Sequence, residues 1–466
     1  MLRAQRELRA LRLQPLQPHD RHALPALGKP FVNRHVIVLT HEFSRTGAPI
    51  ACVQLAQLLS REGAVVRLIG WDSQRRSPKE LAAFSSSIVP DPQFSTEAAL
   101  ENLDAVVMSG ADLVVVSSAV SHQAAWVAQF RAKVSAAAGG HDSREQLPMS
   151  GPRIAWWLHE GAGSELPRDM LDGAAALLAQ RGALDGVMFV SSTARSFWER
   201  EIRRAAGVEL AELPLHQYVL RWGIPDWQQE ALGGGGCRME EGGNKGACAA
   251  RAARGIAESD FVFLALASFQ AIKGQAGMAR AFAAARKRCG GGGGGGGGVV
   301  GEQRRRLRFV MAGVGYGWTD PSFFPQADVA WVRTDPDFLL EGPTEHPTEL
   351  LHAADAYVSN TLGGGESWGL STLTAMAAGK PVLASAAGAT TEQMKHGESA
   401  LLHAVPAEGS GEPQDIEELA THMCAVFEDS KLRKRLGDAA RAHVREELGQ
   451  SHLESALAEA LGPLLR

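Results

Sequence analysis

The sequence predicts an α/β protein with two doubly wound halves facing a central crevice, followed by a helical C-terminal tail. Short runs rich in Val, Ile and Leu alternate with stretches of helical apolar spacing. This is the pattern of βαβ units around a parallel sheet that is buried on both faces. The alternation is broken once, by a glycine-rich segment, and then starts again. A chain of 466 residues is long enough for two such halves.

The first half is predicted at residues 34–225 and begins with the strand-like run HVIVLT. Further strand-like runs are GAVVRLIG, DAVVM, ADLVVVSS, RIAWWLH and GVMFVSS, with helical stretches such as ARSFWEREIRRA between them. Residues 1–33 are Arg-rich, and we expect a disordered basic leader there. The leader lacks serine, which argues against a transit peptide. We therefore expect a cytoplasmic protein, and organelle targeting by the basic leader stays open as the alternative.

The second half is predicted at residues 259–448, after a Gly-rich linker or surface insertion at residues 226–258. Its strand-like runs are FVFLALASF, LRFVMAG, DVAWV, AYVSN, PVLAS and ALLHAV. The glycine tract at residues 290–298 cannot bury apolar surface, so we expect a disordered loop there. Residues 449–466 are predicted to form a C-terminal helix. A ligand is expected in the crevice at the carboxyl ends of the strands.

Composition excludes several classes of protein. Hydrophobic residues make up 45% of the chain and charged residues 21%, as in soluble globular proteins. The formal net charge of −5 argues against a general nucleic-acid binder. No uninterrupted apolar run reaches the roughly 18 residues that span a bilayer. We expect no transmembrane segment, and only peripheral membrane contact stays open.

Five cysteines are scattered along the chain without a CxxC motif or a His-Cys cluster. A sparse, odd count predicts reduced thiols rather than a disulfide framework or a zinc site. They are Cys52, Cys237, Cys248, Cys289 and Cys424.

Three loops at predicted strand ends are candidates for chemistry. In THEFSRTGAPIACVQ, Gly47 and Pro49 stand where a strand turns into a helix, and the helix N-terminus suits a phosphate or carboxylate. In RIAWWLHEGAG, His159 ends a strand and is of a type that titrates near neutrality. In LASFQAIKGQ, Lys273 precedes a helix start and suits a diphosphate. An ordinary turn, a structural histidine and a solvated lysine are the alternatives.

Two further motifs resemble known ligand-binding motifs, but neither is interpreted as a binding site. RFVMAGVGYGW resembles a dinucleotide fingerprint, but Trp318 stands where the third glycine is needed, so we interpret it as a tight loop at the crevice rim. This argues against an NAD enzyme. The DxD at Asp335 and Asp337 is interpreted as a solvated acidic turn, and no metal site is expected.

The segment TLGGGESWGLSTLTAMAAGKP places Glu366 behind three glycines and just before a short helix. Gly379 ends that helix. A carboxylate in this position can satisfy amides at the helix N-terminus, which is the structural interpretation. It can also bind the hydroxyls of a sugar that lies across the loop.

These segments together resemble the GT-B glycosyltransferases of family 4 (glycosyl transferases group 1), and most of all their plant and algal versions. The resemblance covers residues 34–448 and is most specific at residues 355–385. It implies a GT-B fold of two Rossmann-like domains and a retaining enzyme. It also implies a UDP- or GDP-linked sugar as co-substrate, with no cofactor and no metal.

The resemblance also assigns roles to individual positions. It places His159 near the reacting sugar and Glu366 on hydroxyls of the transferred sugar, so both are candidate catalytic residues. The donor-binding positions that it implies are Gly47, Ala48, Lys273, Glu366, Trp368, Gly369, Leu370 and Thr374.

The chain departs from the family pattern at two donor contacts. The arginine that usually precedes the lysine is missing, because residues 268–270 are Ser-Phe-Gln. The acid pair E-x7-E begins at Glu366, but its second acid, which normally binds the ribose diol, is Thr374. A charge-assisted hydrogen bond contributes about 1.5–3 kcal/mol, so losing one predicts roughly tenfold to a hundredfold weaker donor binding.

The first hypothesis is therefore a retaining hexosyltransferase with a weakened donor motif, acting on a glycan, lipid or small-molecule acceptor. The alternative is a GT-B pseudoenzyme that binds a nucleotide or glycan in a scaffold or regulatory role. A third reading, a nucleotide enzyme such as a sugar epimerase, shares the architecture but not the Glu366 segment. The sugar, the base, the acceptor and the oligomeric state stay open.

Overall fold

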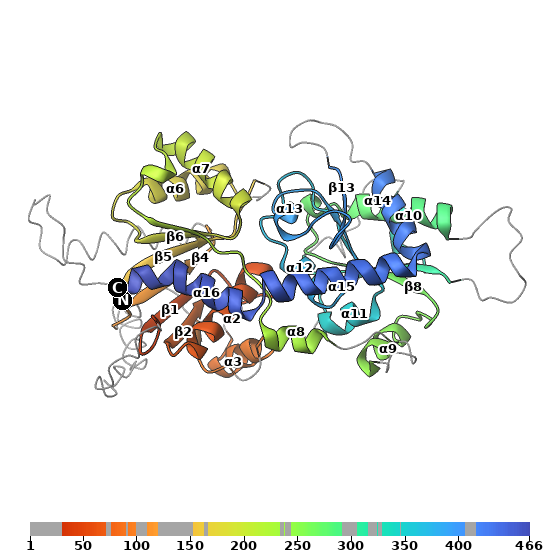
Figure 1. Cartoon of the computed structure of the whole chain (residues 1–466), viewed down its shortest axis with the longest axis horizontal. Helices are drawn as coiled ribbons and strands as arrows, with labels where there is room; N and C mark the ends of the chain where they lie inside the picture. Colours follow the sequence, from red (N-terminus) through yellow and green to blue (C-terminus); the bar gives the residue numbers. More distant parts are fainter. Residues whose placement is uncertain are drawn as a thin grey trace, which may run out of the picture.

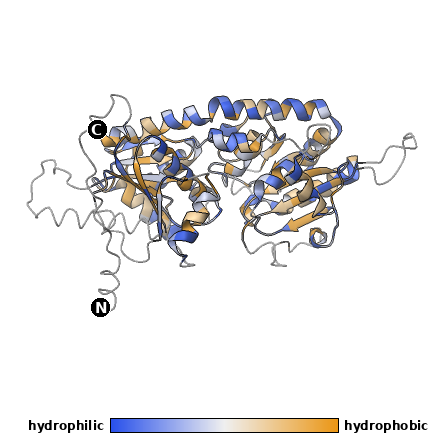
Figure 2. Cartoon of the chain, turned by 90° about the horizontal axis from the view of Figure 1, so that it is seen from below, coloured by the Kyte–Doolittle hydropathy of each residue, from blue (hydrophilic) through white to orange (hydrophobic). Residues whose placement is uncertain are grey.

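The computed structural model describes residues 30–70, 76–89, 92–98, 110–119, 152–162, 166–233, 237, 244–290, 305–315, 324, 329–344, 346–405 and 416–466. It contains two α/β domains lying side by side, with long helices near the C-terminus running along both (Figure 1). Strands are largely hydrophobic and the outer helix faces hydrophilic (Figure 2).

The N-terminal domain is built on a seven-stranded sheet of order β3-β2-β1-β4-β5-β6-β7, and every neighbouring pair is parallel. The strands are β1 His35–Thr40, β2 Val65–Gly70, β3 Ser95–Ala98, β4 Leu113–Ser117, β5 Arg153–Leu158, β6 Gly186–Phe189 and β7 His216–Val219. Its helices are α2 Gly47–Arg61, α3 Pro78–Ser86, α6 Arg168–Ala179, α7 Ser192–Ala206 and the 3-10 turn η1 Leu210–Glu212.

Local signals explain where these helices start and stop. Ser77 and Glu80 form a capping box at the start of α3. The Ser191 hydroxyl accepts from the Ala194 amide at the start of α7, and Gly207 ends that helix in the left-handed conformation. The central strand β4 is buried along its whole length, as the apolar run LVVVS predicts.

The C-terminal domain repeats the same winding with a six-stranded parallel sheet of order β10-β9-β8-β11-β12-β13. The strands are β8 Phe261–Leu266, β9 Leu307–Ala312, β10 Phe338–Glu341, β11 Ala356–Ser359, β12 Val382–Ser385 and β13 Leu401–His403. The helices are α10 Gln275–Cys289, α11 Pro347–Ala353, α12 Leu370–Ala377, α13 Thr390–Gln393, α14 Ile416–Glu428 and α15 Ser430–Glu447, with 3-10 turns η3 Ala271–Lys273 and η6 Ala330–Arg333. Both domains thus have the doubly wound order that was expected.

The chain ends by returning to the N-terminal domain. Helix α16 (Gln450–Leu461) and the 3-10 turn η7 (Gly462–Leu465) bury their leucines in the core of that domain. The Tyr218 hydroxyl on β7 donates to the Glu459 carboxylate at 2.9 Å. At the crossing between the domains, the Ile224 amide donates to the Leu448 carbonyl at 2.9 Å. A Cβ on Gly223 would lie 1.9 Å from that carbonyl oxygen, so only glycine permits this approach.

The domain limits predicted from sequence need two corrections. Residues 226–258, predicted as a Gly-rich linker or surface insertion, hold two short helices, α8 (Asp226–Leu232) and α9 (Lys245–Ala252). Glycines around these short helices hide their periodicity. Residues 30–33 are ordered and Phe31 is buried, so the leader ends earlier than expected. Residues 1–29, and the glycine tract from residue 291 onward, lie outside the described residues.

The prediction of reduced thiols is wrong for four of the cysteines. Cys237 is bonded to Cys248, and Cys289 at the end of α10 is bonded to Cys424 on α14. Cys52 on α2 is buried and free. Partners 135 positions apart in sequence are joined only by the fold, so spacing gave no sign of them. Among the helices of the described part, none is long and apolar enough to cross a membrane.

Candidate active site

Two adjoining cavities, of about 370 Å³ and about 350 Å³, lie between the carboxyl ends of the two sheets. The larger is lined mostly by the C-terminal domain, where the resemblance in sequence leads us to expect the donor, and we call it the donor cavity for that expectation. The smaller is lined by His41, Ser118 and His159 of the N-terminal domain, among others, and we call it the acceptor cavity because the acceptor is expected on that side. Residues lining both cavities are Thr46, Gly47, Lys273, Glu366, Trp368 and Leu370.

The loop after β1 supplies one wall of the cleft. Gly47 begins α2, lines both cavities, and has no atom within 4 Å of the position where a Cβ would stand. Protein packing therefore does not demand a glycine here, whereas close approach of a ligand would. The Thr46 hydroxyl contacts Ser44 at 2.8 Å and does not cap the helix. The N-terminus of α2, with Gly47 and Ala48, thus faces the cleft.

His159 lies at the end of β5 and packs against Trp157, with 4.4 Å between ring centroids. Burial, reinforced by the nearby His41, lowers the pKa of His159 to about 3. The expectation of titration near neutrality is therefore wrong, and the imidazole is neutral. Its Nε2 is buried without a hydrogen-bond partner among the described residues. Because an unmet buried polar atom costs about 1–3 kcal/mol, a ligand hydroxyl bonded here would offset that cost.

Glu160 also lines the acceptor cavity, but its carboxylate is already hydrogen-bonded within the protein. Its carboxylate accepts from the Ser118 hydroxyl, from the Ala119 amide at 2.8 Å and from the His159 amide at 3.1 Å. Burial raises the pKa of Glu160, while these hydrogen bonds oppose the rise. The carboxyl thus ties β4 to the turn after β5.

Lys273 is placed by a tight junction between two loops of the C-terminal domain. It ends η3 and is followed by Gly274 at φ 63°. A Cβ on Gly274 would lie 2.1 Å from the Asn360 carbonyl oxygen. The Asn360 side-chain amide donates to the Gly274 carbonyl at 3.0 Å. These contacts lock the lysine loop against the strand that leads to Glu366.

Glu366 and Lys273 meet where the two cavities join. The Lys273 Nζ lies 3.1 Å from the Glu366 carboxylate, and both side chains are largely buried, at 19% and 14% exposed. The Thr361 hydroxyl donates to the same carboxylate oxygen at 3.3 Å. Gly365 permits this fold of the loop, because a Cβ there would lie 2.3 Å from Ile272. The structure thus brings together the acid and the lysine that the sequence predicted separately.

Helix α12 follows Glu366 and points its N-terminus into the donor cavity. Leu370 and Ser371 line that cavity, but the Gly369 amide is already engaged by the Gln393 side chain at 3.3 Å. The Trp368 indole donates to the Trp222 carbonyl at 2.6 Å, across the domain boundary. Trp368 therefore contributes more to joining the domains than was expected.

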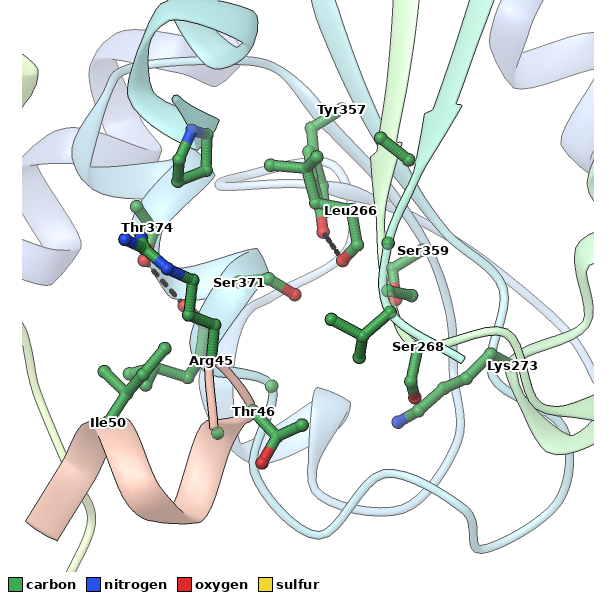
Figure 3. A pocket seen from close by; sticks show the side chains of 18 of the residues that line it. Arg45, Thr46, Ile50, Leu266, Ser268, Lys273, Tyr357, Ser359, Ser371 and Thr374 are labelled. Carbon is green, nitrogen blue, oxygen red and sulfur yellow. Dashed lines mark hydrogen bonds between the residues drawn. The ribbon is translucent and has the colours of Figure 1, made fainter. Parts of the chain in front are cut away.

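Thr374 also lines the donor cavity, one helical turn further along α12. Its hydroxyl donates to the Leu370 carbonyl at 2.8 Å (Figure 3). With its proton used inside the helix, the oxygen offers a ligand only lone pairs. Thr374 can therefore accept one hydrogen bond from a ribose hydroxyl.

The DxD motif lies away from the cleft. Asp335 and Asp337 precede β10, at the opposite end of the sheet from the cavities. Asp335 pairs with Arg286 at 2.7 Å and Asp337 with Arg306 at 2.5 Å. Their interpretation as a solvated turn is wrong, because both carboxylates are largely buried in ion pairs. Within the described ranges, no group of three or more His, Cys, Asp or Glu side chains could hold a metal ion.

Sequence reasoning missed two charged residues near the site. Arg45, inside the quoted segment THEFSRTGAP, lines the donor cavity. Glu392 on α13 reaches the N-terminal domain, where it accepts from the Ser192 and Thr193 amides at 3.0 and 2.8 Å. A basic residue just before the glycine turn was a signal for the first. Nothing in the sequence marked the second.

Two family models match the chain, one in each domain. Residues 32–211 match the model described as glycosyl-transferase family 4, and residues 249–443 match glycosyl transferases group 1. Trehalose phosphorylase of Pleurotus pulmonarius is 31% identical over 103 residues, which are 22% of this chain but only 13% of that protein.

Solved structures share the fold at low sequence identity. HepE of Anabaena, solved with UDP and glucose, is 16% identical at a TM-score of 0.63, over 91% of this chain and 98% of that one. Sucrose-phosphate synthase of Thermosynechococcus elongatus is 16% identical at a TM-score of 0.61, over 92% and 98% of the two chains. With both domains matched in sequence and in fold, the chain belongs to the family 4 glycosyltransferases of the GT-B fold.

Proposed function

We propose that the chain is a retaining hexosyltransferase that moves a hexose from a UDP- or GDP-linked sugar to a glycan, lipid or small-molecule acceptor. The observation that carries this proposal is the Lys273–Glu366 pair at the junction of the two cavities. A cation there meets the diphosphate, and a carboxylate meets the hydroxyls of the transferred sugar. That HepE was solved with UDP and glucose supports a nucleotide-sugar donor.

In the proposed reaction the nucleotide occupies the donor cavity and the acceptor enters the acceptor cavity. The bond from the anomeric carbon to the diphosphate oxygen breaks, and the acceptor oxygen bonds to the same face of that carbon. The acceptor proton passes to the departing diphosphate. Lys273 and the N-terminus of α12 stabilise the charge that develops on the diphosphate. We propose that this set of groups needs no metal.

His159 serves in this proposal as a hydrogen-bonding residue. A pKa of about 3 means that it carries no proton to give as an imidazolium at neutral pH. The Nε2 atom, which has no partner in the described part of the chain, would bond a hydroxyl of the transferred sugar or of the acceptor. It would orient the reacting group rather than exchange a proton with it.

The pseudoenzyme remains a second candidate because of Thr374. Its hydroxyl donates to the Leu370 carbonyl, so Thr374 binds a ribose less strongly than a carboxylate would. A chain that binds a nucleotide but does not transfer sugar would use the same cleft. Turnover separates the two candidates.

The experiment is nucleotide release from a panel of UDP-, GDP- and ADP-sugars by the purified full chain. We expect slow release that Glu366→Ala and Lys273→Ala both abolish. The exposed residues Lys395 and Glu398, in the same domain, give matched controls as Lys395→Ala and Glu398→Ala. Nucleotide binding without release from any donor would favour the pseudoenzyme.

A further inference from the structure

The charge balance of the donor cavity depends on one residue of the opposite domain. Among the described residues, three charged side chains line this cavity, namely Arg45, Lys273 and Glu366. Lys273 and Glu366 lie 3.1 Å apart and neutralise each other. Within this described part of the lining, the net positive charge is therefore that of Arg45, which belongs to the loop between β1 and α2.

Arg45 is held loosely by the protein itself. Its single hydrogen bond within the described residues runs from Nη2 to the Ser87 hydroxyl at 3.2 Å, and it makes no ion pair with a described carboxylate. Figure 3 shows its side chain running from just before the start of α2 toward Thr374 on α12. A half-buried guanidinium aimed into a cavity keeps most of its five donors available for a ligand.

Among the described residues of the C-terminal domain, Lys273 is the one cation that lines the donor cavity, which is little positive charge for a nucleotide diphosphate. Lys273 shares its charge with Glu366, and residues 268–270 carry no cation. The N-terminus of α12 adds only about half an elementary charge. A guanidinium suits phosphate oxygens better than an ammonium does, because its planar fork donates two parallel hydrogen bonds.

We propose that Arg45 is a donor-binding residue whose guanidinium binds the diphosphate from the N-terminal domain. It supplies, from across the cleft, the cation that residues 268–270 lack. The inference rests on the nucleotide-sugar function proposed above. One consequence is that the diphosphate contacts both domains, through Arg45 on one side and Lys273 on the other.

Thr374 fits this arrangement. An acid at position 374 would lie in the direction in which Arg45 points and would compete with phosphate for the guanidinium. A threonine whose proton is bound by the Leu370 carbonyl carries no charge and leaves Arg45 to the ligand. The two departures from the family pattern, at residues 268–270 and at Thr374, are thereby explained together.

The test is calorimetric binding of a diphosphate, a monophosphate and a nucleoside of one base to the full-length chain. All three ligands carry the same base, which is the base of whichever nucleotide, UDP, GDP or ADP, binds the wild type most tightly. For Arg45→Gln we expect the diphosphate Kd to rise roughly tenfold to a hundredfold, the range of a charge-assisted hydrogen bond. The monophosphate should lose less, and the nucleoside Kd should stay unchanged.

Two further variants sharpen the test. Arg45→Lys keeps the positive charge but not the planar pair of guanidinium donors, so we expect an intermediate loss of diphosphate affinity. If the glutamine variant does not fold, the lysine variant replaces it in the test. Arg61→Gln removes an exposed charge at the far end of α2 and should change nothing.

Two results would overturn the inference alone. One is wild-type diphosphate affinity in Arg45→Gln and Arg45→Lys, and the other is an equal loss for the nucleoside. A wild-type chain that binds no nucleotide diphosphate at all would instead overturn the proposed function, and the inference with it.

Discussion

At the scale of single residues, Lys273 and Glu366 hold two charges that cancel in the absence of a ligand. Their carboxylate–ammonium distance of 3.1 Å means that each is the nearest counter-charge of the other. A nucleotide-sugar would give each a new partner, phosphate for the lysine and sugar hydroxyls for the acid. Substrate binding would thus replace the Lys273–Glu366 ion pair by two contacts to the same molecule.

Glu366→Gln is predicted to separate binding from turnover. Removing the negative charge beside Lys273 frees the ammonium for phosphate, so nucleotide diphosphate affinity should stay equal or rise. Turnover should fall by at least about tenfold, the effect of one lost charge-assisted contact to the transferred sugar. Calorimetry and nucleotide release measure the two effects, with Glu398→Gln as the control. Weaker diphosphate binding in Glu366→Gln would contradict this account of the pair.

Thr374→Val tests the ribose contact. A neutral hydrogen bond contributes about 0.5–1.5 kcal/mol, so the Kd of a ribonucleotide diphosphate should rise roughly twofold to tenfold. The 2′,3′-dideoxy analogue lacks the donating hydroxyls and should bind both proteins equally. If the valine variant loses the same affinity for both nucleotides, Thr374 does not contact the ribose.

His159 is predicted to stay neutral across the physiological range. Folding lowers its pKa from 6.5 to about 3, because burial disfavours the charged imidazole. The unfolded chain therefore takes up a proton below about pH 6.5 that the folded chain does not. His159 lowers the free energy of unfolding as pH falls from 6.5 toward 3. NMR should show no His159 titration between pH 5 and 8, and a midpoint inside that range would refute the assignment.

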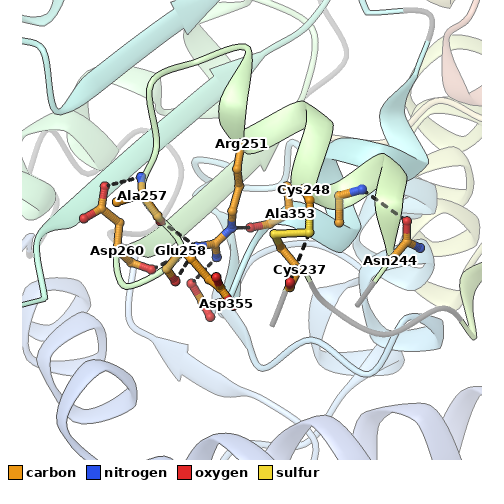
Figure 4. The surroundings of a disulfide bond; sticks show 10 residues. Cys237, Asn244, Cys248, Arg251, Ala257, Glu258, Asp260, Ala353 and Asp355 are labelled. Carbon is orange, nitrogen blue, oxygen red and sulfur yellow. Dashed lines mark hydrogen bonds and ion pairs between the residues drawn. A yellow bond between two sulfur atoms is a disulfide. The ribbon is translucent and has the colours of Figure 1, made fainter. Parts of the chain in front are cut away.

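At the scale of elements, two disulfides fix helices of the C-terminal half. The Cys237–Cys248 bond lies beside Arg251, which donates to the Ala353 carbonyl and the Asp355 carboxylate and so ties α9 to the sheet (Figure 4). The Cys289–Cys424 bond joins α10 to α14. Disulfides persist in oxidising compartments and are rare in the cytoplasm, which is the location expected from the sequence.

Thiol counting tests these bonds. In denaturant without reductant, we expect one reactive thiol per chain, that of Cys52, and five after reduction. Cys424→Ala should lower the free energy of unfolding of the oxidised protein by about 2–4 kcal/mol, the usual contribution of a native disulfide. Five reactive thiols before reduction would show that the cysteines are not paired.

The helices and strands also show which parts of the fold could be predicted from the sequence. Strand runs such as HVIVLT and FVFLALASF are buried on both faces, so their composition alone identified them as parallel strands. The Glu366 loop and the Lys273 loop were found because glycines mark close backbone approach. Helix α9 was missed because it has only eight residues, one of which is Gly246. Disulfide partners and the ion pairs of the DxD motif depend on distant segments, which no local pattern reports.

At the scale of the whole molecule, several contacts among the described residues hold the two domains together. The chain crosses twice, at residues 223–224 and 448–449, and Trp368 bonds the Trp222 carbonyl. In addition, the Glu392 carboxylate accepts from the amides at the start of α7 and lies 3.3 Å from the Arg221 guanidinium. Burial alone would raise the pKa of Glu392, but the Thr193 hydroxyl and the two amides lower it.

Glu392→Gln is predicted to loosen the contact between the two domains. Because the folded-state pKa is below the ordinary 4.5, the contact is fully present above that pH and is lost as pH falls through the lowered value. The variant lacks the charge at every pH. Small-angle scattering should give a larger radius of gyration for Glu392→Gln than for wild type at pH 7, with Glu398→Gln unchanged. Equal radii would show that this contact does not hold the domains.

The central claim is that the cleft transfers a hexose from a nucleotide-sugar, and donor turnover tests it most directly. The purified full chain is incubated with UDP-, GDP- and ADP-linked hexoses, and free nucleotide is measured over time. The account predicts release from at least one donor, abolished by Glu366→Ala and by Lys273→Ala but not by Glu398→Ala. No release from any donor, or release that survives both cleft substitutions, would contradict it.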